Sequence, residues 1–232
     1  MPNAELVSHA PIHVRAPDAR WADDPLARCL LRRAQGALQK WPEGFPGFRA
    51  SARGQTARGT ADAEVAVNAH GAVELHCDDA GLRTQLHEML RRLVAQRTPR
   101  FFDDGDGRFS IAFADANANA SERAVEVHVR SGRLTYWIDG RGRVRREERA
   151  GDGLRVLTSF EEHCRTTPGR VLPVKISIAT WDLTSGALLG TEIIHDSHRR
   201  LDHVWLPLSR QISGPGGGDP SLRVTLDDHQ LL

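Results

Sequence analysis

A stretch near residue 200 carries the side chains best suited to chemistry. Its candidate metal ligands are His195, His198 and His203, with Asp196 and Asp202 between them. Neutral imidazoles and carboxylates are ordinary ligands of zinc, copper and iron. On an extended strand His195 and His198 point to opposite faces, so a bulge would have to bring them together. His195 and His203 could instead meet across a hairpin that turns near 201–203.

Two further histidines could complete such a site. His163 follows Glu161-Glu162 and precedes Cys164, and His128 lies in the middle of a predicted strand. A thiol beside an imidazole can be activated, but the sequence offers no third partner for a catalytic pair. The competing interpretation makes all these histidines exposed or hydrogen-bonded structural residues.

The motifs of several enzyme classes are absent. There is no GxxxxGK[ST] phosphate loop and no GxSxG elbow. His87-Glu88 begins like HExxH, but Arg91 stands in place of the second histidine. The segment GDGRFS lacks the third glycine of a dinucleotide-binding loop and is typical of a turn. Catalytic residues are therefore not identified, and whether the protein is an enzyme stays open.

Aromatic side chains are the other candidates, as a ligand-binding set: Tyr136, Trp137, Trp181 and Trp205. Aromatics that line a concave sheet suit an apolar or flat ligand. The alternative is that aromatics fill the core between sheet and helices, which we prefer for Tyr136 and for Phe160. Trp137 projects from the face opposite Leu134 and Ile138, so core packing explains it less well.

Two amphipathic helices are expected to position these residues. Asp23 and Asp24 supply an N-cap before Pro25, and an apolar stripe runs on to Trp41. Asp78 or Asp79 caps a second helix that ends near Pro99.

The remaining chain has the period-two pattern of β-strands. Tight turns such as Ser131-Gly132 and Ser185-Gly186 join successive strands, which must therefore pair antiparallel in a long meander. Residues 213–220 are expected to form a hairpin tip. The predicted strands are 48–57, 61–67, 71–77, 108–114, 122–130, 133–139, 142–149, 153–162, 171–183, 187–200, 204–212 and 221–229.

The predicted fold class is α+β. Two helices cannot cover so many strands in a flat sheet, so we expect a strongly curved antiparallel half-barrel wrapped around them, with a cavity at its mouth. Residues 1–22 are expected to be a flexible arm and 23–232 a single domain.

Composition excludes several partners. The 31 basic and 30 acidic residues give a net charge of +1, which disfavours nucleic-acid binding. No apolar run reaches 18 residues, so no membrane-spanning helix is expected. The N-terminal residues lack the apolar core of a signal peptide, and the cysteines are an odd three. These features predict a cytoplasmic protein; the oligomeric state stays open.

Three segments resemble an uncharacterised bacterial family of unknown function. They are GFPGF after the first helix, LPVKISIATWDLTSGALLGTEI, and the ending LRVTLDDHQLL. The resemblance covers residues 26 to 232 and implies no activity. The order of elements is also similar to the LolA-like lipoprotein-carrier half-barrels, which hold acyl chains. Gln96-Arg97 stands where the family resemblance implies a His-Arg pair, and His198 where it implies an aromatic.

The leading functional hypothesis is a non-enzymatic protein that binds an apolar or amphiphilic small molecule. The alternative is a metal-dependent enzyme, oxidative in chemistry, with copper, zinc or iron on the late histidines. A third interpretation is a structural protein that binds a partner through an edge strand.

Overall fold

The structure is a computed structural model that describes residues 22–114, 121–129, 132–166, 169–214 and 221–232. The predicted arm, apart from Ala22, and most of the predicted tip at 213–220 lie outside the described residues.

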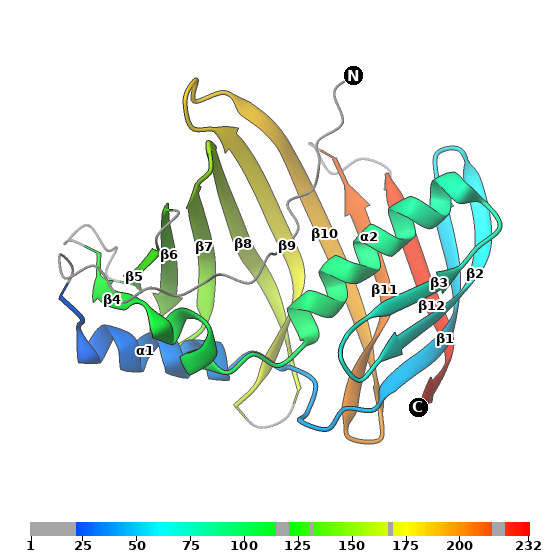
Figure 1. The fold of residues 1–232 in the computed structure, drawn as a ribbon, viewed down its shortest axis with the longest axis horizontal. Coiled ribbons are helices and arrows are strands. Elements are labelled where there is room, and N and C mark those ends of the chain that lie inside the picture. The colour runs from blue at the N-terminus through cyan, green and yellow to red at the C-terminus, as the bar shows by residue number, and fades with distance from the viewer. Residues whose placement is uncertain (1–21, 115–120, 130–131, 167–168, 215–220) are drawn as a thin grey trace.

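Among the described residues, twelve strands form one antiparallel sheet in the order β3-β2-β1-β12-β11-β10-β9-β8-β7-β6-β5-β4 (Figure 1). The sheet does not close, because β3 and β4 are its two edges. The strands are β1 Gly47–Thr56, β2 Gly59–Asn68, β3 Val73–His76, β4 Ser110–Phe113, β5 Glu122–Val129, β6 Gly132–Asp139, β7 Val144–Gly151, β8 Leu154–Arg165, β9 Val171–Asp182, β10 Leu188–Leu201, β11 Val204–Ser213 and β12 Leu222–Leu231.

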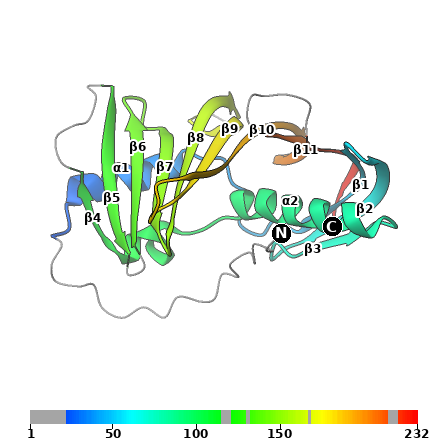
Figure 2. The same cartoon turned by 90° about the horizontal axis from the view of Figure 1, so that it is seen from above.

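The predicted curved half-barrel is confirmed. Strands β4 to β12 form the expected meander, and the sheet bends so that its two ends face different directions (Figure 2). The first three strands extend it because β1 pairs with β12, with Ala52 opposite Leu226. That pairing joins the first strand in the sequence to the last one. Local sequence patterns do not reveal it, because the two strands are far apart along the chain.

Helix α1 spans Pro25–Gly36. Asp24 caps it, because its Oδ1 accepts hydrogen bonds from the backbone N–H groups of Leu26 (2.8 Å) and Ala27 (3.1 Å). The helix ends before the predicted Trp41. The chain instead pairs with β9, where Leu38 forms a parallel bridge to Val171. Tertiary pairing therefore overrides the helical stripe at this end.

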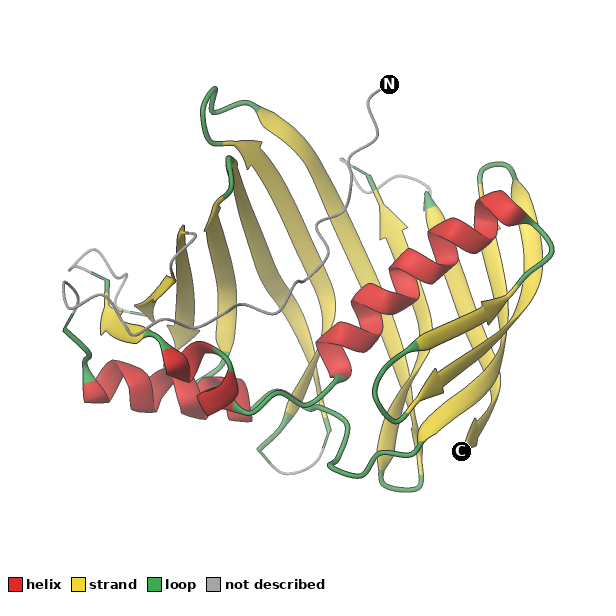
Figure 3. Ribbon diagram, viewed as in Figure 1, coloured by secondary structure: helices red, strands yellow, loops and turns green. Residues whose placement is uncertain are grey.

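Helix α2 spans Ala80–Arg97 and packs on β1 and β3. Asp79 caps it by accepting from the N–H of Leu82 at 2.8 Å. Gly54 on β1 permits the close approach, since a Cβ built there would lie 2.8 Å from Cδ1 of Leu86. The chain then returns through two short 3₁₀ helices, Phe102–Asp104 and Asp106–Arg108, to β4 at the opposite edge (Figure 3).

Each helix has its own hydrophobic core on the sheet. Ala27, Leu31 and Ala34 of α1 pack with β4 to β7. The stripe of α2, including Leu86 and Leu90, packs with β1, β2 and β10 to β12. Phe160 of β8 contacts both cores. The middle of the sheet therefore lies between two separately packed halves. No described helix is long and apolar enough to cross a membrane.

Candidate functional site

The candidate site is the inner face of β7, β8 and β9, between the two cores. Tyr136, Glu147, Thr158 and Ile178 form one cross-strand row. Residues directly opposite one another share a face of the sheet. Tyr136 belongs to the α1 core, so the whole row points inward. We call the following residues the inner strip: Glu147, Arg149, Val156, Thr158, Phe160 and Ile178.

The inner strip combines an apolar centre with charge at its α1 side. Val156, Phe160 and Ile178 are only partly buried, although each lies on the inner face. Arg149 is exposed and lies opposite Val156. An apolar surface beside fixed charges suits a molecule with an apolar body and a polar head.

Glu147 lies in a polar group at the α1 side, in which Tyr136 is buried and the other members are partly buried. Burial raises the pKa of its carboxyl, and the nearby charges of Arg149 and Lys40 counteract that rise. The Tyr136 hydroxyl donates to Asp106 Oδ2 at 2.7 Å, and Gln35 Nε2 donates to the same oxygen at 2.6 Å. Burial also raises the pKa of Tyr136, so the phenol stays a donor.

Lys40 connects this group to α2. Its Nζ donates to the backbone carbonyl of Gln96. Burial, together with the charges of Arg97 and Arg100, lowers the pKa of Lys40 to about 8. The ammonium therefore loses its proton more readily than an ordinary lysine, and a nearby anion would favour the charged form.

A second polar cluster, the α2-end cluster, holds the last turn of α2 to the sheet, with Arg97 and Arg210 buried and Gln96 exposed. Its members are Gln96, Arg97, Asp196, His198 and Arg210. Arg210 binds Asp196 through Nη2 to Oδ2 at 2.6 Å and donates to Gln96 Oε1 at 2.6 Å. Arg97 donates to the carbonyls of Gln39 at 2.8 Å and Trp205 at 3.1 Å. The Gln96-Arg97 pair singled out in the sequence thus has a positioning role.

His198 faces the same cluster. Burial and the charge of Arg97 lower its pKa to about 4, so the ring is neutral at neutral pH. Three buried nitrogens here, Arg97 Nε, Arg210 Nη1 and His198 Nδ1, have no hydrogen-bond partner in the structure.

The predicted metal ligands do not come together. The described residues contain no group of three or more His, Cys, Asp or Glu side chains that could hold a metal ion. A bulge does lie between Ser197 and His198, as a shared site would need, yet His195 is exposed and His198 partly buried. His195 lies opposite Gln211, and His203 follows the turn. The expectation that His195 meets His203 is wrong, because the hairpin pairs His195 with Gln211 and five residues of β10 separate His195 from Leu201.

The two additional histidines lie on other strands. His163 Nδ1 is 3.4 Å from Arg145 Nη1, and burial lowers the pKa of His163 to about 4. His128 lies beside Glu126, with Nε2 3.8 Å from Oε2. Cys164 is partly buried and its thiol contacts the carbonyl of Arg165 at 3.4 Å.

The four predicted ligand-binding aromatics are divided between environments. Tyr136 faces inward and is 7% exposed. Trp137 and Trp181 lie on the outer face, where Arg146 and Arg155 each cover one ring at 4.7 Å from its centroid. Trp205 lies on β11 near the α2-end cluster. The sequence favours core packing for Phe160 as for Tyr136, and Phe160 does pack against both cores, although it remains partly exposed.

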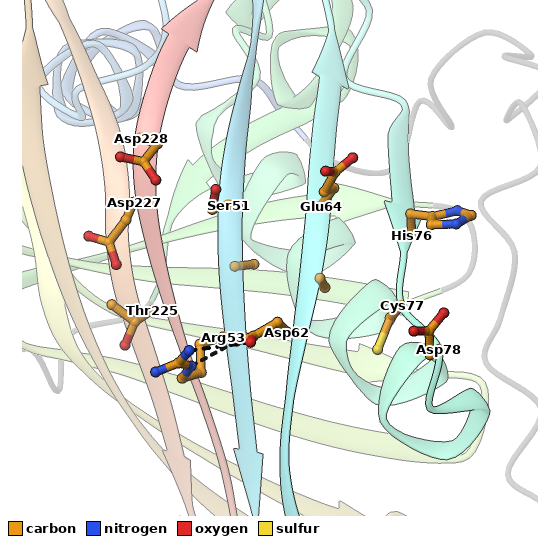
Figure 4. Close-up of a pocket in the computed structure, with 12 residues that line it drawn as sticks. Ser51, Arg53, Asp62, Glu64, His76, Cys77, Asp78, Thr225, Asp227 and Asp228 are labelled. Atoms are coloured by element: carbon orange, nitrogen blue, oxygen red, sulfur yellow. Dashed lines mark hydrogen bonds and ion pairs between the residues drawn. The ribbon is translucent and has the colours of Figure 1, made fainter.

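A groove lies elsewhere, on the outer face of β12, β1, β2 and β3 (Figure 4). It encloses about 790 Å³ and is rich in carboxylates. Arg53 pairs with Asp62 at 2.7 Å across its floor, and Asp227 and Glu64 flank them. Its exposed charged lining is unsuited to an apolar ligand, in contrast to the inner strip.

A family model matches residues 22–232, and that family is described as "Protein of unknown function (DUF3386)". The predicted family resemblance is confirmed. No curated protein matches the chain.

Solved structures align with most of the chain at low TM-scores. A LolA superfamily protein from Nitrosomonas europaea has a TM-score of 0.37 and 11% identity, covering 89% of this chain and 93% of that one. A domain described as an outer membrane lipoprotein-sorting protein, from Vibrio parahaemolyticus, has a TM-score of 0.31 and 10% identity, covering 88% and 92%. The MucA/MucB complex of Pseudomonas aeruginosa gives 0.24 and 13%, covering 86% and 92%.

Proposed function

The chain belongs to the DUF3386 family of proteins of unknown function, and we propose that it binds an amphiphilic small molecule on the inner strip. The role is that of a holder or carrier, with no bond made or broken in the ligand. One observation carries the proposal. Phe160 contacts both hydrophobic cores and is still partly exposed, so it joins them through a surface that a ligand can cover.

The chemistry of the strip favours a ligand with two different ends. Covering Val156, Phe160 and Ile178 with an apolar body would gain about 25 cal/mol per Å² removed from water. Lys40 and Arg149 lie toward the α1 side, where both act on the charge of Glu147. An anionic head group would pair with these cations, so a fatty acid or similar monoanionic amphiphile fits best.

Only one of the four aromatic residues predicted to bind ligand belongs to the proposed site. Tyr136 lies beside Glu147 and belongs to the proposed site. Trp137 and Trp181 lie on the outer face, and a ligand role for them and for Trp205 stays a prediction. The expected cytoplasmic location also stays a prediction, supported by three unpaired cysteines.

Titration with a dansyl-labelled fatty acid tests the proposal. We expect saturable binding by the wild type and at least tenfold weaker binding by Phe160→Ser. The matched control is Leu157→Ser, a change on the same strand that faces outward opposite Ala179. The control should bind within about twofold of the wild type.

Two results would contradict the proposal. One is no saturable binding by the wild-type chain. The other is an equal loss in Phe160→Ser and Leu157→Ser, which would mean that general loosening of β8 weakens binding. Thermal unfolding of both variants separates local from global effects.

A further inference from the structure

The tip of the β9–β10 hairpin exposes large apolar side chains. Leu183, Leu188 and Leu189 are 47%, 56% and 58% exposed, and Leu154 of the adjoining β7–β8 turn is 40% exposed. The hairpin extends beyond the neighbouring β7–β8 turn (Figure 1). From Leu183 to Gly190 the sequence LTSGALLG contains no charged residue. Such a cluster of exposed leucines on a projecting, charge-free tip needs an explanation.

Hydrogen bonds within the turn hold the tip in a defined conformation. Asp182 Oδ1 accepts from the N–H of Thr184 at 3.0 Å and from the N–H and Oγ of Ser185 at 2.7 and 2.8 Å. The carboxylate is therefore used inside the turn. The N–H of Leu183 donates to the carbonyl of Gly153 at 2.8 Å, which joins this turn to the one that carries Leu154. Leu154 lies on the inner face, whereas Leu188 lies opposite Trp181 on the outer face, so the joined turns expose leucines on both faces of the tip.

Two structural features accompany the exposed leucines of the tip. A bulge between Leu188 and Gly190 gives Leu189 no partner position on β9, and both leucines remain more than half exposed. Behind the tip, Trp181 lies beneath the Arg155 guanidinium, at 4.7 Å from the ring centroid. A tryptophan and an arginine behind an apolar tip are the side chains that prefer the boundary between lipid and water.

We propose that the β9–β10 tip inserts into the surface of a lipid bilayer. The exposed fractions of the four leucines together amount to about two whole leucine side chains. That area is far below the roughly 800 Å² that each partner contributes to a stable protein interface, which argues against a second copy of the chain. A bilayer requires no shape-matched partner and accepts a small apolar tip.

The tip is also continuous with the inner strip. Along β8, Leu154 leads through Val156 and Thr158 to Phe160 on one face, since alternate residues of a strand share a face. A tip in the bilayer would place one end of this apolar row at the lipid surface. This part of the inference rests on the proposed function, whereas bilayer binding itself does not.

Co-sedimentation with phosphatidylcholine vesicles, with and without phosphatidylglycerol, tests the proposal. We expect the wild type to bind both kinds and Leu188→Glu/Leu189→Glu to bind at least tenfold more weakly. The matched control is Leu26→Glu on α1, where an even more exposed leucine (74%) lies at a distant position. It should bind like the wild type.

The proposal is overturned if the wild type does not sediment with either vesicle, or if Leu26→Glu loses as much binding as the tip variant. Binding that needs phosphatidylglycerol and survives the tip substitutions would equally overturn it. An unchanged unfolding temperature shows that the tip variant folds. Fatty-acid titration of the tip variant separates the two proposals. If the variant loses vesicle binding but still binds the fatty acid, the tip acts in bilayer binding and not in ligand binding.

Discussion

Arg210 and Asp196 form an ion pair in the interior, with Nη2 and Oδ2 2.6 Å apart and side chains 1% and 4% exposed. Arg210 also reaches Gln96 on α2, so the pair holds the helix end to β10 and β11. A buried pair costs desolvation on both sides, and removal of one partner leaves the other charge unpaired.

Arg210→Met should therefore lower the free energy of unfolding by about 3–5 kcal/mol. Urea denaturation measures it. The double variant Arg210→Met/Asp196→Leu should recover part of that loss, since no unpaired charge remains. The exposed pair Arg53–Asp62, with side chains 70% and 73% exposed, is the control, and Arg53→Ala should leave the free energy of unfolding nearly unchanged. An equal loss of unfolding free energy in Arg210→Met and Arg53→Ala would contradict the role of the buried pair in holding α2 to the sheet.

Gly54→Ala should destabilise the protein by about 1–3 kcal/mol through overpacking. The new methyl group would lie 2.8 Å from Cδ1 of Leu86 and 3.1 Å from Cδ2 of Leu82, so these two side chains of α2 would have to repack. Gly190→Ala on β10 is the control, since a Cβ there meets nothing within 4 Å. Thermal or urea unfolding compares the two. A neutral Gly54→Ala would show that α2 is loosely held.

His198 should make stability fall in mild acid. Its pKa of about 4 in the folded chain is below the ordinary 6.5, so the unfolded chain binds the proton first. The contribution of His198 is full above pH 6.5, falls between pH 6.5 and about 4, and is constant below that. The charged neighbours that oppose protonation are Arg97 and Arg210, and Asp196 favours it.

His198→Leu should remove this dependence, which would amount to about 3 kcal/mol. The check is the difference in unfolding free energy between wild type and variant at pH 7 and pH 4. His195→Ala, which changes an exposed residue three positions away, is the comparison variant. A His198→Leu profile parallel to that of the wild type would refute the prediction.

Glu147→Gln should stabilise the ligand-free protein by about 1 kcal/mol at pH 7. The pKa of Glu147 is raised by burial, so its stability contribution decreases as the pH rises through the folded value. The gain should disappear in acid, where the carboxyl is protonated in both states. Urea unfolding at pH 7 and pH 4 measures both values. A variant less stable at pH 7 would mean that Lys40 and Arg149 outweigh the burial cost.

Strand positions could be predicted well, because alternation along each strand is a local signal. The opposite faces of Trp137 and Ile138 followed from that alternation, and the structure confirms them. The end of α1 could not be predicted, since the bridge from Leu38 to Val171 joins residues 133 positions apart. The cluster of Lys40, Asp106, Tyr136 and Glu147 had no sequence signal. Its members come from four separate segments that only the completed sheet brings together.

Helix α2 and the segment 98–109 cross the inner face from the β3 edge to the β4 edge of the sheet (Figure 3). One continuous segment of chain therefore links the β3 edge of the sheet to the β4 edge, and its length is fixed. This connection limits how far the two edges can move apart. Under the proposed function, the length of the chain between residues 77 and 110 would therefore restrict the size of the ligand that the sheet can hold.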